Sequence, residues 1–229
     1  MKNSGKALLA ALRLIALAGA ALLALLVVAF LAKWFAIVVL HYLLWALVGL
    51  WVLFTVFALY FFRDPDSLVP TATNLVVAPG HGKVDAVDTV NEPEFMGGEC
   101  QRVSIFLSII SVHVQCAPVA GRVACFKHTP GRYLSALRAE SAQFNENVLI
   151  GLESTEPRGE KIGVRLIAGV IARRIVPWIK ENDVVQRGDR ISLIQFGSRV
   201  DVYLPRRAKI RVKPGDKVTG GETAIAAFD

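Results

Sequence analysis

The sequence predicts a mainly β protein of the α+β class, in which an apolar helical segment precedes a β-rich domain. The chain is 54% hydrophobic with a mean hydropathy of +0.47, which is higher than in ordinary soluble domains. This excess is concentrated before residue 63. After that point, short runs rich in β-branched residues alternate with Gly, Pro and Asp, which is the pattern of strands and turns.

The apolar segment extends from Ala7 to Phe62, and its only side chains that could carry a positive charge are Arg13, Lys33 and His41. One straight helix of this length would measure roughly 84 Å at about 1.5 Å per residue, whereas a bilayer core is about 30 Å thick. We therefore expect two hydrophobic helices divided at Lys33, although no Gly or Pro marks a turn there. They would form a transmembrane hairpin or a hairpin that dips into one leaflet.

The charges around the anchor predict its orientation. Lys2, Lys6 and Arg13 precede most of the apolar segment, and Arg63 follows it. Because cytoplasmic flanks are enriched in Lys and Arg, we expect both ends of the anchor, and the domain, on the cytoplasmic side of the cell membrane. The apolar segment is much longer than the core of a signal peptide, so we expect it to be retained as an anchor.

The composition argues against two classes of function. The net charge is +7, but no stretch combines clustered basic residues with aromatic ones as a nucleic-acid groove does. We therefore expect no nucleic-acid partner, and a mildly basic domain beside anionic lipid is the simpler interpretation. The three cysteines, Cys100, Cys116 and Cys125, lack metal-ligand spacing, so neither a metal site nor a disulfide framework is expected.

Residues 63–229 are predicted to form one β-rich domain after the anchor of residues 1–62. Six runs are expected to be strands: Leu75–Ala78, Lys83–Val90, Arg102–Ile110, Gly121–Phe126, Val164–Ile167 and Ile191–Phe196. Ala168–Ile179 is ambiguous between strand and helix, and Ser135–Phe144 is either a short helix or a loop.

A weak internal repeat favours a barrel or sandwich. Val185–Ile191 contains a Gly-Asp pair that is echoed in Val212–Val218, and Pro79–Val84 is a looser third copy. In each copy, one strand is expected to enter a tight turn and a second strand to leave it. Repeated hairpins of this kind are typical of biotinyl/lipoyl-type domains. No Lys occupies the tip of a Met-Lys-Met-like turn, so we do not expect a swinging-arm carrier.

A Gly-Ser pair, Gly197-Ser198, separates two strand-like runs near the C-terminus. Glycine leaves its carbonyl unhindered, and the serine hydroxyl could attack that carbonyl if a base lay nearby. The dipeptide is common and is also consistent with a simple turn. Its meaning therefore depends on the other motifs of the chain.

Motifs spread over nearly the whole domain occur in a characteristic order. They include Phe61-Phe62-Arg63-Asp64-Pro65, Val77-Ala78-Pro79, Gly82-Lys83-Val84, His113-Val114, Ala117-Pro118-Val119-Ala120-Gly121, Ala172-Arg173-Arg174-Ile175, Gly188-Asp189-Arg190 and Phe196-Gly197-Ser198-Arg199-Val200-Asp201. In this order and spacing, the chain resembles the short membrane-anchored class of phosphatidylserine decarboxylase.

The resemblance implies a self-processing enzyme that makes its own prosthetic group. Ser198 would attack the Gly197 carbonyl, and the chain would split into a β chain, residues 1–197, and an α chain, residues 198–229. Ser198 would become a pyruvoyl group, which accepts electrons as CO₂ leaves the substrate. The substrate would be phosphatidylserine in membrane lipid, and the product phosphatidylethanolamine. No metal or diffusible cofactor is expected.

His113 matches the family's active-site histidine, so the resemblance implies a base for cleavage and a proton donor in decarboxylation. The alternative is a structural histidine on a strand. The chain departs from the family at His81, where related chains usually have an aspartate that orients and charges the histidine. A neutral imidazole brings no negative charge to that position. Ser111, Cys116 and Asn147 also replace residues that are common in the family.

Two other functions remain open from the sequence. An uncleaved, non-catalytic relative could act as a membrane-anchored binding or scaffold module, and His81 at the usual aspartate position motivates this alternative. The same chemistry could also act on another lipid with an amino-acid head group, because no feature of the sequence indicates selectivity for particular acyl chains or stereochemistry. A homo-oligomer is possible.

Overall fold

The computed structural model describes residues 6–133, 144–169, 174–194 and 198–229, and the side chains of the N-terminal helix from residue 15 onward. Contacts divide the chain into two compact units, Met1–Ala58 and Leu59–Asp229. Gly197 and nearly all of Ser135–Phe144 lie outside the described residues, so the predictions made for them are not tested here.

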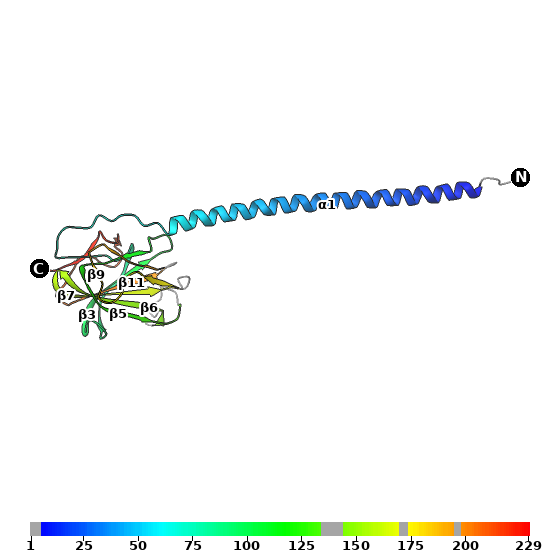
Figure 1. The fold of residues 1–229 in the computed structure, drawn as a ribbon. Coiled ribbons are helices and arrows are strands. Elements are labelled where there is room, and N and C mark those ends of the chain that lie inside the picture. The colour runs from blue at the N-terminus through cyan, green and yellow to red at the C-terminus, as the bar shows by residue number, and fades with distance from the viewer. Residues whose placement is uncertain (1–5, 134–143, 170–173, 195–197) are drawn as a thin grey trace. The chain divides into compact units, whose positions relative to one another are not determined.

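The N-terminal segment forms one helix, α1 (Lys6–Phe61), of 56 residues (blue to cyan in Figure 1). The predicted pair of helices with a turn at Lys33 is thus one continuous element. No Pro or Gly interrupts the backbone near Lys33, and sharp kinks in helices usually need such a residue. By length and composition, Ile15–Phe61 could cross a membrane, with a hydropathy of 2.8.

The second unit is β-rich, as predicted. Its strands are β1 (Leu75–Val77), β2 (Gly82–Glu92), β3 (Gly98–Leu107), β4 (Val114–Cys116), β5 (Ala120–Thr129), β6 (Asn147–Glu156), β7 (Arg158–Ala168), β8 (Ile175–Pro177), β9 (Val184–Val185), β10 (Arg190–Ile194), β11 (Ser198–Leu204), β12 (Lys209–Ile210), β13 (Lys217–Val218) and β14 (Ala224–Ala227). Among the described residues, all pairings between these strands are antiparallel.

The strands form three sheets. The largest has eight strands in the order β13-β2-β3-β11-β7-β6-β5-β9, and the two small sheets have the orders β1-β14-β12 and β4-β10-β8. Six strands of the large sheet are labelled in Figure 1. Strand β11 is paired along both edges, with Ser198 opposite Leu107 of β3 and Ala168 of β7. The strand that begins at the predicted cleavage site is therefore an interior strand of the main sheet.

Both faces of β11 are buried. Val200, Val202 and Leu204 belong to the main hydrophobic core. Successive side chains of a strand point to opposite faces, so Ser198 shares the face of these three residues. On the other face, Tyr203 packs with Phe95, Cys100 and Leu149 in a smaller apolar cluster. The strand is therefore enclosed by side chains as well as by its neighbours in the sheet.

The two better copies of the internal repeat have the same turn geometry. Gly188 and Gly215 have φ angles of +88° and +101°, which glycine adopts without strain. The following Asp189 and Asp216 each accept a hydrogen bond from the backbone N–H three residues earlier, at 2.7 and 2.9 Å. In both copies, however, the flanking strands belong to different sheets. The repeat thus forms corners between sheets and not the paired hairpins expected from the sequence.

Candidate active site

Ser198 is the first residue of β11 and is fully buried. Within the described part of the chain, its Oγ has no hydrogen-bond partner. Such groups are uncommon, because a buried hydroxyl without a partner has lost its hydrogen bonds to water. The Ser198 hydroxyl would therefore give up no hydrogen bond to the described residues if it reacted.

His113 lies in the loop between β3 and β4 and is also fully buried. Its ring stacks on the Phe61 ring, with centroids 4.2 Å apart and an interplanar angle of 29°. The Nδ1 atom is 2.9 Å from the Ser111 carbonyl oxygen. Because a carbonyl only accepts hydrogen bonds, Nδ1 carries the proton in this contact, and Nε2 is the nitrogen that bears the ring's lone pair.

Side-chain and backbone contacts fix the backbone of His113. Its carbonyl oxygen accepts hydrogen bonds from Gln115 Nε2 at 2.6 Å and from the Ile194 N–H at 3.1 Å. Ser192 Oγ donates to Gln115 Oε1 at 2.7 Å. Ile194 ends β10 shortly before Ser198, which itself lies opposite the last residue of β3, from which the chain continues to His113. These connections bring Ser198 and His113 to the same end of the fold.

The environment of His113 favours its neutral form. Burial lowers the pKa of His113 to about 4, and the nearby charge of Arg63 acts in the same direction. The hydrogen bond with the Ser111 carbonyl raises the pKa and offsets only part of this effect. At neutral pH the imidazole is therefore uncharged and can accept a proton at Nε2.

His81 lies in the connection between β1 and β2 and is partly exposed. Burial lowers its pKa, as does Arg63, whereas the carboxylates of Glu222 and Asp64 raise it. His81 is thus a largely neutral group at neutral pH. It supplies no negative charge where the resemblance implies an aspartate.

A cavity of about 320 Å³ is lined by His81, Cys116, Asp64 and Arg190, among other residues. Arg190 bridges two carboxylates, at 2.5 Å from Asp64 and 2.9 Å from Asp66. His81 and Cys116, two positions at which the chain differs from the family pattern, therefore line the same cavity. Neither reactive candidate, the serine nor His113, is among the described residues that line it.

Two further aspartates follow His81 in the sequence, and each pairs with an arginine. Asp85 pairs with Arg199, the residue after the predicted cleavage site, and Asp88 pairs with Arg102 at 2.6 Å. Both aspartate side chains are about two-fifths exposed, at 42% and 43%. Their charges are therefore compensated by arginines on the sheet.

Sequence reasoning missed three groups around His113. These are the Phe61 ring, the Ser111 carbonyl and the Gln115 amide. Phe61 had a signal in the sequence, because it begins the motif Phe61-Phe62-Arg63-Asp64-Pro65, and Ser111 was noted there only for its residue type. The Ser111 carbonyl contacts the imidazole and the Gln115 side-chain amide contacts the His113 carbonyl because of how the loop folds, which residue types alone do not reveal.

Comparison with known proteins agrees with these motifs. The family model for phosphatidylserine decarboxylase matches residues 54–226. The chain belongs to the phosphatidylserine decarboxylase family. A relative named phosphatidylserine decarboxylase proenzyme from Desulfotalea psychrophila is 43% identical over 176 residues, which cover 77% of this chain and 81% of the relative. One of the same name from Symbiobacterium thermophilum is 41% identical over 181 residues, or 79% and 83% of the two chains.

A third relative of that name, from Geotalea uraniireducens, is 42% identical over 192 residues, which cover 83% of this chain and 89% of the relative. The resemblance drawn from the sequence is thus confirmed. At one end of its β domain, this family member has the buried hydroxyl of Ser198, which has no hydrogen-bond partner among the described residues. The neutral imidazole of His113 lies at the same end. Chemically, these groups can serve as a nucleophile and a base.

Proposed function

We propose that this chain is a self-processing, pyruvoyl-dependent decarboxylase that converts phosphatidylserine to phosphatidylethanolamine. The observation that carries the proposal is the buried Oγ of Ser198, which lacks a hydrogen-bond partner among the described residues and begins an interior strand. Family membership and the proenzyme names of the relatives support the same chemistry.

In the proposed maturation, Ser198 Oγ attacks the carbonyl carbon of Gly197, and the peptide C–N bond is exchanged for an ester. Loss of the Ser198 α-proton then eliminates the Gly197 carboxylate and leaves a double bond at residue 198. Water replaces the nitrogen of that residue, which departs as ammonia. The products are a β chain, residues 1–197, and an α chain, residues 198–229.

His113 is proposed as the base for this step. Its Nε2 lone pair can accept the hydroxyl proton without prior loss of a proton, because the imidazole is already neutral. The Ser111 carbonyl fixes the tautomer, and the Phe61 ring fixes the plane of the imidazole. In each later decarboxylation, the imidazole would take up a proton from water and pass it to the product carbon.

The prosthetic group of the mature enzyme would be formed from Ser198. The pyruvoyl group supplies a ketone that accepts the electron pair left when CO₂ departs from the substrate. The buried position of residue 198 excludes bulk water, and the neutral His113 places a proton acceptor and donor at the same end of the sheet.

The proposed site of action is the cytoplasmic face of the cell membrane. The apolar length of α1 supports membrane association. Lys2, Lys6 and Arg63 flank the segment, and such charges are enriched on the cytoplasmic side. Because the proposed substrate is itself a membrane lipid, an anchor would hold the domain beside it.

The test compares Ser198→Ala with Ser154→Ala. Ser154 is another buried serine, whose Oγ donates to the Ala120 carbonyl at 3.1 Å. We expect the Ser198 variant to keep the intact mass of the full chain and to release no CO₂ from carboxyl-labelled phosphatidylserine. The Ser154 variant should be cleaved and active. A cleaved, active Ser198→Ala protein would refute the assignment, and an uncleaved parent chain would favour the scaffold alternative.

A further inference from the structure

A β-turn lies between β3 and His113, and two isoleucines occupy its central positions. The Ser111 N–H donates to the Ser108 carbonyl at 2.9 Å, and the two serine hydroxyls are 3.0 Å apart. Ile109 is 41% exposed and Ile110 is 68% exposed. Exposed turns usually carry Gly, Pro, Asn, Asp or Ser. Two adjacent β-branched apolar side chains at such a tip therefore indicate a non-aqueous surrounding.

Arg63 connects this turn to the last helical turn of α1. Its Nη2 donates to the Ile110 carbonyl at 2.7 Å, and its Nη1 donates to the Tyr60 carbonyl at 2.7 Å. The guanidinium carbon also lies 3.9 Å from the centroid of the Tyr60 ring. Tyr60 and Phe62 are both almost half exposed. An aromatic residue and an arginine at the end of an apolar helix are typical of a membrane–water interface.

We propose that Ile109 and Ile110 insert into the lipid surface where α1 ends, and that the turn is a second membrane contact of the domain. The occupant is lipid because the turn is hydrogen-bonded, through Arg63, to the end of the apolar span Ile15–Phe61. Interfacial segments bury their apolar side chains about 5–10 Å into the boundary between head groups and acyl chains. A two-residue tip suits that depth.

The contact would set the height of the site above the membrane. His113 follows Ser111 by two residues and is bonded to its carbonyl. A turn that is held in the head-group layer therefore holds the imidazole near the level of lipid head groups. The inference rests on the turn and on the helix end, and does not depend on the decarboxylation chemistry.

The experiment places an environment-sensitive fluorophore on Ile110→Cys in the full chain, reconstituted in vesicles of phosphatidylethanolamine and phosphatidylglycerol. The matched control is Val184→Cys, because Val184 on β9 is an equally exposed aliphatic residue at 70%. The parent chain, labelled in parallel, corrects for reaction at Cys125, which is partly exposed. Nitroxide-bearing lipids with the nitroxide high or low on the acyl chain serve as quenchers.

We expect the label at residue 110 to lose most of its emission, more with the shallow nitroxide than with the deep one, and the label at residue 184 to lose little. Equal quenching at the two positions, or none at residue 110, would overturn the proposal. A label at residue 110 that is shielded from water but not quenched by lipid, together with cross-links between residue 110 of two chains, would assign the tip to a second copy instead.

Discussion

Burial affects the two proposed catalytic side chains in different ways. It removes water from the Ser198 hydroxyl without supplying a hydrogen-bond partner among the described residues. It also lowers the pKa of His113, so that the ring is neutral where a base is needed. Burial thus leaves the proposed nucleophile without a hydrogen-bond partner among the described residues and keeps its proposed base neutral.

The pH dependence of maturation follows from the pKa of His113. We predict that self-cleavage of freshly made precursor is nearly constant from neutral pH to about pH 5 and falls through about pH 4. Phe61→Leu opens the ring to water, so its inflection should move to higher pH. Cleavage time courses on denaturing gels measure both profiles. An inflection of the parent chain near the ordinary value of 6.5 would contradict the assignment.

The same shift has a consequence for stability. The folded-state pKa of His113 is below its ordinary value of 6.5, so the unfolded chain takes up this proton first. Its contribution to the free energy of unfolding is constant above about pH 6.5 and decreases as the pH falls toward about 4.

A substitution at position 81 tests whether a negative charge there acts on His113. If it has the role that the resemblance implies, His81→Asp introduces a negative charge that stabilises the imidazolium of His113. We predict faster self-cleavage and an inflection at higher pH. His81→Asn is the matched control, because asparagine has the same shape as aspartate but no charge. We expect it neither to speed self-cleavage nor to move the inflection to higher pH. Equal rates for the two variants would show that charge at this position does not act on cleavage.

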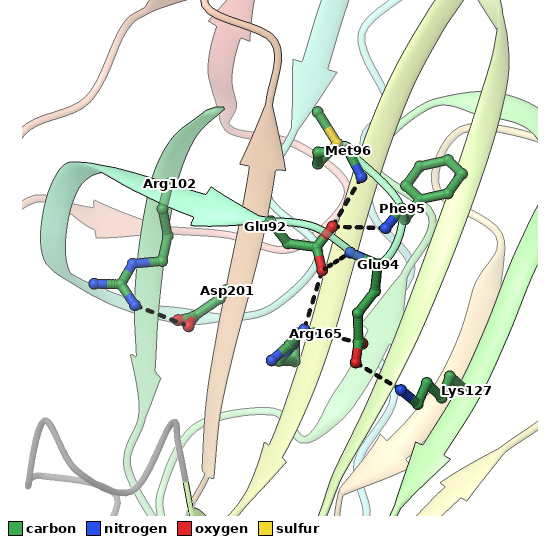
Figure 2. A network of polar contacts seen from close by, with 8 residues as sticks. All are labelled: Glu92, Glu94, Phe95, Met96, Arg102, Lys127, Arg165 and Asp201. Carbon is green, nitrogen blue, oxygen red and sulfur yellow. Dashed lines mark hydrogen bonds and ion pairs between the residues drawn. The ribbon is translucent and has the colours of Figure 1, made fainter. Parts of the chain in front are cut away.

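At the scale of elements, a buried polar network supports the face of the main sheet opposite Ser198. Glu92 ends β2, and its carboxylate accepts hydrogen bonds from the Phe95 and Met96 N–H groups at 2.9 and 2.8 Å. It also pairs with Arg165 of β7 at 3.3 Å (Figure 2). One side chain thus closes the β2–β3 connection and joins it to the strand beside β11.

We predict that Glu92→Ala lowers the free energy of unfolding by about 2–4 kcal/mol, because it leaves buried N–H groups and a partly buried guanidinium without their acceptor. Glu153→Ala is the control. Glu153 pairs with Arg122 at 2.6 Å, but both side chains are about half exposed, so its loss should cost about 0–1 kcal/mol. Urea unfolding of both variants in detergent measures the difference, and equal losses would contradict the role of Glu92.

The strands were predictable where β-branched residues alternate with turn residues, as in the runs now seen as β2, β5 and β10. The predicted run Arg102–Ile110 was too long, since β3 ends at Leu107. Ile109 and Ile110 have the composition of a strand, but a backbone hydrogen bond between Ser111 and Ser108 closes a turn there. The sequence pattern alone does not distinguish apolar residues that contact lipid, as proposed for these two, from apolar residues of a protein core.

The candidate site was predictable only in part, and for a related reason. Ser198 and His113 could be named because motif order and spacing identified the family. The tautomer and pKa of His113 depend on a carbonyl, on a ring from the helix end and on burial. These are properties of tertiary packing, and the residue types do not encode them locally.

For the whole molecule, the position of the proposed cleavage site determines how the two chains would stay associated. The proposed α chain contains β11, β12, β13 and β14. Strands β11 and β13 belong to the eight-stranded sheet, and β12 and β14 belong to the sheet that also contains β1. Val200, Val202 and Leu204 of the fragment are buried in the main core. Cleavage before Ser198 therefore breaks one covalent bond but leaves two sheets that depend on both chains.

We predict that the cleaved chains elute as one particle in mild detergent and separate only in denaturant. High salt should not release the α chain, because backbone hydrogen bonds and apolar burial hold it, and screening weakens neither. Size-exclusion chromatography followed by denaturing gels of each fraction measures this. The uncleaved Ser198→Ala chain is the reference for elution volume. An α chain that elutes alone without denaturant would mean that β11 is not held on both edges, and the interior position of the cleavage strand would have to be abandoned.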